Sequence, residues 1–173
     1  MNRRTVIRDL TLALGGLATV PAWANGWKAE SLLMPTGLLK PTEQQMLAIV
    51  AETIIPESNT KGAISLGIPA FLEIMLKDCY EAPVTENVIN GLKAADATAE
   101  SQFGKSFADS DTAQKQQILL GFEKSQDTKL KDFYTLIKNL TILGYTTSEY
   151  VQTGFLNYNM APGHYYGCVP VKK

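Results

Sequence analysis

The fold class of this chain is decided by the stretch IPAFLEIMLKDC, residues 68–79. Its apolar residues recur at helical spacing and so form one stripe: Ile68, Phe71, Leu72, Met75, Leu76 and Cys79. Pro69 suits the first turn of this helix, because the N–H that proline lacks would be unpaired there anyway. The stretch therefore predicts a helix with one buried face, and Pro83 is expected to close the unit.

Helical spacing continues on both sides of this stretch. The other predicted helices run from a capping box at Thr42 and Gln45 to Pro56, from a cap at Thr85 to Gly104, from a cap at Ser110 through Phe122, and from Leu130 to Gly144. No strand alternation competes with these patterns. The sequence therefore predicts an all-α protein, a compact bundle of about five helices.

The C-terminal part of the chain, from Tyr145 to Lys173, has a different composition. It is rich in tyrosine, glycine and proline, and we expect an irregular, aromatic-rich arm rather than a helix. Aromatic side chains on an irregular segment need a surface to cover. That surface is either the chain's own helices or another protein.

The N-terminus has the features of an export signal. Arg3 and Arg4 give it a basic start, and no charge occurs from Leu10 to Trp27. The residues NRRTVIR, 2–8, resemble the twin-arginine motif, which exports proteins that are already folded. An ordinary secretory signal and an uncleaved anchor are the alternatives.

A cleavage site of the small-x-small type follows at Ala22 and Ala24. We therefore expect a signal peptide over residues 1–24 and a lead-in over residues 25–40. The helical domain is expected over residues 41–173, with its arm starting at residue 145.

Composition excludes several classes of function. The 173 residues include 16 Lys and Arg against 17 Asp and Glu, so no basic footprint for nucleic acid exists. One histidine and two cysteines leave few ligands for a metal, haem or iron–sulfur site. The dinucleotide, haem-attachment, zinc-protease, P-loop and nucleophile-elbow motifs are absent. We therefore expect no catalytic, cofactor-binding or metal-binding residue in this chain, and His164 is expected to be a solvated or packed side chain.

The two cysteines allow two arrangements in an oxidising compartment. A Cys79–Cys168 disulfide would join the arm to the bundle. Alternatively, Cys79 is a buried free thiol on the apolar stripe and Cys168 bonds a partner chain. The second arrangement is favoured, because the sequence pattern predicts an exposed Cys168 and a buried Cys79.

Several short motifs, in order, resemble the gluconate 2-dehydrogenase subunit 3 family. They are TIIP at residues 53–56, GAISLGIPAF at 62–71, Gly91-Leu92, FGKSF at 103–107, GYTTSE at 144–149 and PGHYYGCVP at 162–170. The chain departs from the family pattern at Lys61, where a proline is common, and at His164, where a basic residue is common.

The resemblance implies a non-catalytic small subunit. Similar proteins accompany a large flavoprotein of the glucose–methanol–choline type, which holds FAD, and often a multihaem cytochrome c. The small subunit supports folding and stability of the flavoprotein and carries the twin-arginine signal for both, through the twin-arginine translocase. The expected location is the periplasm, with association to the membrane through the complex.

The partner interface is expected in the arm. The candidate residues are Tyr145, Ser148, Pro162, Gly163, Tyr165 and Tyr166. Two other functions stay open: a self-standing periplasmic enzyme, which the missing motifs disfavour, and a solitary exported helical binding or scaffold protein.

Overall fold

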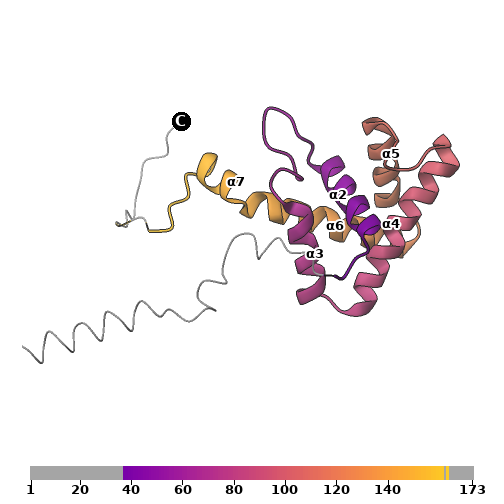
Figure 1. Ribbon diagram of the computed structural model, residues 1–173, viewed down its shortest axis with the longest axis horizontal. Helices are drawn as coiled ribbons and strands as arrows, with labels where there is room; N and C mark the ends of the chain where they lie inside the picture. The colour runs from indigo at the N-terminus through magenta and orange to yellow at the C-terminus, as the bar shows by residue number, and fades with distance from the viewer. Residues whose placement is uncertain (1–36, 162, 164–173) are drawn as a thin grey trace, which may run out of the picture. The chain divides into compact units, whose positions relative to one another are not determined.

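The computed structural model describes residues 37–161 and 163, and over these residues it contains helices and no strand (Figure 1). The helices are α2 (Pro41–Ile54), α3 (Ile68–Cys79), α4 (Ala82–Phe103), α5 (Thr112–Glu123), α6 (Thr128–Thr147) and α7 (Glu149–Gly154). The prediction of an all-α bundle is confirmed. The expected signal residues Arg3, Arg4, Ala22 and Ala24 lie outside the described residues, and so do Pro162, Tyr165, Tyr166 and Cys168.

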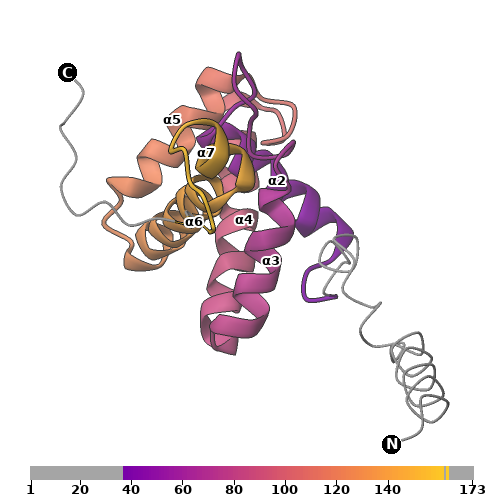
Figure 2. The ribbon, with the colours of Figure 1, turned by 90° about the vertical axis from the view of Figure 1, so that its left-hand side faces the viewer.

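Helix α6 is the central element of the bundle. It packs against α2, α3, α4 and α5, and α7 follows directly at its C-terminal end (Figures 1 and 2). One apolar core joins these helices, and its largest fully buried side chains are Phe107, Phe133, Leu47, Leu72, Leu76, Leu92 and Ile137. Phe133 also meets Phe122 of α5 edge to face, with ring centres 6.3 Å apart.

A buried carboxylate fixes the chain where it enters the bundle. Glu73 of α3 is only 6% exposed. It accepts hydrogen bonds from the Gln44 side-chain amide at 2.9 Å and from the Leu39 backbone amide at 3.4 Å. Because two donors satisfy this carboxylate, α3 can hold it inside while tying down the start of α2.

The starts of two helices differ from the predictions. Helix α2 begins at Pro41, not after a cap at Thr42, because Glu43 accepts the Lys40 amide at 3.0 Å and so closes the first turn two residues earlier than predicted. Helix α4 begins at Ala82, so Pro83 lies in its first turn instead of closing the preceding unit.

The predicted caps at Thr85 and Ser110 were also wrong. Thr85 is buried, and its hydroxyl donates to the Leu76 carbonyl at 3.4 Å. Ser110 is buried as well and donates to the Ser106 carbonyl at 2.9 Å, so Asp111 becomes the N-cap of α5. In both places the hydroxyl donates to a carbonyl of the preceding segment. The hydroxyl oxygen then does not accept a backbone amide of the next helix, so the residue does not cap that helix.

The prediction of an irregular arm from Tyr145 was wrong in its starting point. Gly144 does not end α6, which continues to Thr147. A Cβ at Gly144 would lie 2.7 Å from Cδ1 of Phe71, so this glycine serves the close approach of α6 to α3. Ser148 then caps α7, because its hydroxyl accepts the Val151 amide at 3.4 Å. The irregular segment begins at Phe155.

Candidate docking surface

Two carboxylates fold the loop between α2 and α3, residues 55–67, back onto the end of α2. Glu52 lies in the last turn of α2. Its carboxylate accepts the Glu57 amide at 2.7 Å and the Ile64 amide at 3.0 Å. A single side chain therefore holds two loop positions that are seven residues apart in the sequence. Glu52 therefore makes two structural hydrogen bonds to the loop.

The second carboxylate, Glu57, closes the inner part of the loop. It accepts the Gly62 amide at 2.7 Å and the Ser65 hydroxyl at 2.6 Å. The Ser65 hydroxyl lowers the pKa of Glu57 below its ordinary value, with smaller effects of the same sign from the Gly62 amide and the Lys61 charge. These donors favour the ionised form, so Glu57 is a carboxylate at neutral pH.

Gly62 is required by this packing. A Cβ there would lie 2.5 Å from the Glu57 nitrogen and 2.9 Å from Oε1 of Glu52. These two atoms are hydrogen-bonded to each other. Moving either of them away from a side chain at position 62 would therefore break this bond. We refer to Glu52, Glu57, Gly62 and Ser65 as the carboxylate clasp.

The clasped loop presents two side chains to solvent and to α7. Ile64 is 52% exposed although its backbone is held on both sides. The Lys61 ammonium lies 5.4 Å from the ring centre of Tyr150 in α7. Tyr150 in turn meets Phe155 edge to face at 5.5 Å. The loop and α7 are thus connected by a continuous series of contacts.

Large apolar side chains are exposed on the segment after α7. Phe155 is 56% exposed, Leu156 61% and Met160 86%. Backbone bonds order this segment, since the Tyr158 amide donates to the Gln152 carbonyl at 2.8 Å. We call Lys61, Ile64, Tyr150, Phe155, Leu156, Tyr158 and Met160 the docking surface.

The charge pattern around the docking surface is unusual for a surface exposed to water. Between Leu143 and Ala161 the sequence has one charged residue, Glu149. Apolar and aromatic side chains with few charges are typical of the centre of a protein interface. The sequence pattern predicts an interface in the arm but does not indicate that Lys61 or Ile64 belongs to it. The position of Lys61 beside Tyr150 depends on the loop conformation that the clasp holds, which no local sequence pattern reveals.

The sequence-predicted interface residues are distributed unevenly. Tyr145 and Ser148 are half-buried at the junction of α6 and α7, where the Ser148 hydroxyl donates to the Tyr145 carbonyl at 2.7 Å. Ser148 is the N-cap of α7, so these two residues hold the start of that helix rather than form an exposed contact surface. Gly163 is exposed with a φ of 72°. Pro162, Tyr165 and Tyr166 are among the residues that the structure does not describe.

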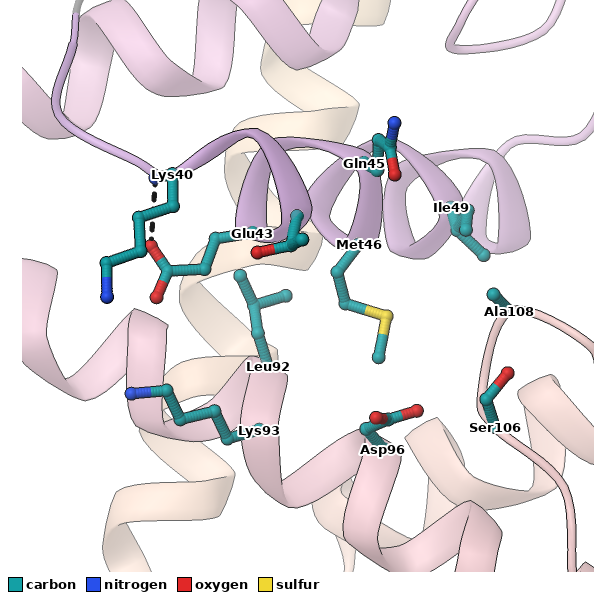
Figure 3. A pocket seen from close by; sticks show the side chains of 11 residues that line it. Lys40, Glu43, Gln45, Met46, Ile49, Leu92, Lys93, Asp96, Ser106 and Ala108 are labelled. Carbon is teal, nitrogen blue, oxygen red and sulfur yellow. Dashed lines mark hydrogen bonds between the residues drawn. The ribbon is translucent and has the colours of Figure 1, made fainter.

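A hollow of 410 Å³ lies elsewhere, between α2, α4 and the segment after α4 (Figure 3). Met46 and Leu92 line its apolar part, and the Lys40 and Lys93 side chains extend to the same end of it. Its carboxylates have structural roles, since Glu43 closes the first turn of α2 and Asp96 accepts the Phe107 amide at 2.8 Å. We therefore assign these carboxylates to local structure.

A second hollow, an apolar groove of 320 Å³, lies between the end of α2 and helices α5 and α6. Leu120 and Ile142 are half-exposed beside it. Lys138 of α6 pairs with Glu123 of α5 at 2.8 Å, which raises the pKa of Lys138. Burial raises the pKa of Tyr134, another lining residue.

Cys79 is exposed at the end of α3, not buried as its place on the apolar stripe predicted. It falls in the last turn, beyond the helices that cover the rest of the stripe, and its thiol lies 3.9 Å from the Met75 sulfur. Within the described residues its thiol has no disulfide partner, and because Cys168 lies outside that range, both disulfide arrangements stay predictions.

Among the residues that the structure covers, no cluster of three or more potential metal ligands occurs. Within the same part of the chain, no helix has the length and apolar character needed to cross a membrane.

Comparison with protein-family models identifies a family for this chain. The family model described as Gluconate 2-dehydrogenase subunit 3 matches residues 41–163. That range begins at the first residue of α2 and includes the clasp, α7 and the apolar segment after it. Searches of curated proteins and of solved structures find no match.

Proposed function

This chain belongs to the gluconate 2-dehydrogenase subunit 3 family, and from this premise we propose that it is the non-catalytic small subunit of a periplasmic, FAD-dependent dehydrogenase of sugars, polyols or sugar acids. Its task is to support folding and stability of the large flavoprotein subunit. It also carries the export signal for that subunit.

The observation that carries the proposal is the docking surface. Four large apolar or aromatic side chains, Phe155, Leu156, Tyr158 and Met160, are more than half exposed on one short segment. A folded subunit leaves such residues in water only at a free-energy cost, which burial against a partner removes. A large obligate interface with an apolar centre is the arrangement that fits them.

The remaining parts of the proposal follow from the family and the N-terminal sequence. FAD belongs to the partner flavoprotein of the glucose–methanol–choline type, and a multihaem cytochrome c is a further partner. Arg3 and Arg4 would direct the assembled pair to the twin-arginine translocase. A folded passenger that already holds FAD needs such a route, because the ordinary secretory route carries unfolded chains.

The experiment is co-expression with a flavoprotein of the glucose–methanol–choline type from the same organism, followed by capture through a tag on the small subunit. We expect a yellow complex with a much larger chain from the periplasm. The double variant Phe155→Ser/Leu156→Ser should lose the flavin absorbance. Leu120→Ser, a similarly exposed leucine on α5, is the matched control and should retain it.

A colourless small subunit captured alone, in wild type as in the variants, would contradict the proposal and leave the solitary scaffold. Replacing Arg3 and Arg4 by lysine tests the export part separately. Both chains should then stay in the cytoplasm while still forming the yellow complex. Export of the flavoprotein without this signal would contradict a shared export route.

A further inference from the structure

We infer that Glu52 and Glu57 are positioning residues of the docking surface. Their carboxylates set the α2–α3 loop so that Ile64 meets an apolar side chain of the partner and Lys61 meets a carboxylate of the partner. The inference rests on the proposed function, which supplies the partner. It adds that hydrogen bonds within the small subunit order the docking surface before the partner binds.

The loop is ordered by two side-chain carboxylates, Glu52 at the end of α2 and Glu57 in the loop itself. Four hydrogen bonds of 2.6–3.0 Å run from loop donors to Glu52 and Glu57, and all four acceptor atoms are carboxylate oxygens. Charge-assisted bonds of this kind are the stronger ones in proteins. A loop that is already ordered loses less conformational entropy when a partner binds, so the clasp raises affinity without contacting the partner.

The loop holds the apolar side chain of Ile64 in water. The Ile64 amide donates to Glu52, and the Ile64 carbonyl accepts the Gly67 amide at 3.0 Å. Its neighbour Ala63 is fully buried, whereas Ile64 points outward and is 52% exposed. The bundle core therefore does not need Ile64. A β-branched apolar side chain fixed in this way suits a pocket on another protein.

The positive charge of Lys61 is not paired with a carboxylate of the described residues. Its ammonium lies over Tyr150, and no described carboxylate lies within 4 Å of it. The nearby Glu57 carboxylate is already occupied by the Gly62 amide and the Ser65 hydroxyl. A cation that keeps donors free beside an apolar surface is complementary to a carboxylate on the partner. The surface therefore fits an apolar protein face with an acidic residue near its edge.

The test is a competition for the flavoprotein inside one cell. Wild-type and variant small subunits, each full-length and with a different tag, are co-expressed with one flavoprotein. The ratio of the two tags in the flavin-containing fraction measures relative affinity. The variants are Glu52→Gln and Glu57→Gln. The matched control is Glu43→Gln, which removes the same charge at the opposite end of the same helix while its side-chain oxygen still accepts the Lys40 amide.

We expect each clasp variant to fall about fivefold or more behind wild type, because a neutral amide weakens the charge-assisted bonds that order the loop. Glu52→Gln also loses one of the two acceptor oxygens that hold the Glu57 and Ile64 amides. Glu43→Gln should compete almost equally. Hydrogen exchange of each isolated variant should show faster exchange of the Gly62 and Ile64 amides for the clasp variants, with the rest of the bundle unchanged. That combination supports a positioning role.

Three results would overturn the inference. Equal competition by clasp variants whose loop amides do exchange faster would show that loop order is irrelevant to docking, while the proposed function stands. An equal deficit in Glu43→Gln would show a general effect of stability. If wild type captures no flavoprotein at all, the proposed function fails and the inference fails with it.

Lys61 gives an independent variant if a clasp substitution lowers expression. Lys61→Arg keeps a cation over Tyr150 and should compete like wild type. Lys61→Glu should fall behind by about tenfold or more, because like charges would face each other. Equal competition by Lys61→Glu would overturn the acidic partner residue.

Discussion

Phe133 of α6 lies directly against Gly91 of α4, and a Cβ built on Gly91 would overlap the Phe133 ring. Both residues are buried, and Phe133 is inaccessible to solvent. The missing side chain lets the central helix approach α4 closely, with the aromatic ring filling the space. Gly91 therefore belongs to the core as much as Phe133 does.

Substitution of Gly91 by alanine should destabilise the protein by about 1–3 kcal/mol, because the ring cannot move inside a packed core. Gly121 provides the matched control. It lies within α5 with no atom near its missing Cβ, so Gly121→Ala should be neutral or stabilise by up to about 1 kcal/mol. Urea unfolding of both variants measures the difference. Equal stability of the two would contradict the close packing of α4 and α6.

Glu73→Ala should cost about 1–3 kcal/mol, because the Leu39 amide and the Gln44 side chain lose a buried acceptor. The loss should appear first as faster hydrogen exchange at Leu39. Glu86→Ala is the control, since Glu86 is exposed on α4. An unchanged exchange rate at Leu39 would mean that Glu73 does not hold the start of α2.

The hydrogen bonds that Glu57 accepts in the clasp should persist in mildly acidic solution. The pKa of Glu57 is lowered chiefly by Ser65, so the folded state binds a proton less readily than the unfolded chain. The stabilising effect is therefore complete above the ordinary carboxyl pKa and is lost as pH falls through the lower, folded value. Carboxyl NMR titration should place Glu57 below 4.5, its ordinary pKa.

Ser65→Ala isolates the main cause of this shift. The pKa of Glu57 should rise toward its ordinary value, and the Gly62 amide should remain bonded to the carboxylate. A Glu57 titration that does not respond to Ser65→Ala would place the hydroxyl elsewhere in solution.

Cys79 is exposed, so in a Cys168→Ser variant its thiol should react rapidly with a disulfide reagent without denaturant. In exported wild-type protein, an internal disulfide would leave no reactive thiol and would survive separation from the flavoprotein. A bond from Cys168 to the partner would instead leave Cys79 reactive and join the two chains on a non-reducing gel. The pair of measurements therefore separates the two arrangements.

Much of the fold could be predicted from sequence because helical spacing directly reflects burial. The stripe of residues 68–79 places Ile68, Leu72 and Leu76 in the core, as expected. Helix ends were less predictable, because several residues near each end can cap. Ser110 and Asp111 are adjacent, and only the packing of Ser110 onto Ser106 decides between them.

The candidate site was predictable only in part. A segment poor in charge and rich in aromatics indicates an interface, and that segment does carry exposed Phe155 and Leu156. The clasp was not predictable, because Glu52 reaches Ile64 across 12 positions with no repeating pattern. The helix end predicted at Gly144 was wrong, since a glycine needed for helix packing looks the same in sequence as one that ends a helix.

Removal of residues 155–173 should separate docking from folding. No described residue beyond Gly144 belongs to the buried core, so the truncated bundle should lose at most about 1 kcal/mol of stability. The cut after Gly154 keeps α7 and all of α6, whereas a cut after Gly144 would remove the last turn of α6. Flavoprotein capture should nevertheless be abolished, because Phe155, Leu156 and Met160 are gone.

Circular dichroism and flavin absorbance on the same truncated preparation measure folding and flavoprotein capture together. A folded truncation that still captures the yellow flavoprotein would place the interface elsewhere, with the groove beside Leu120 and Ile142 as the next surface to test.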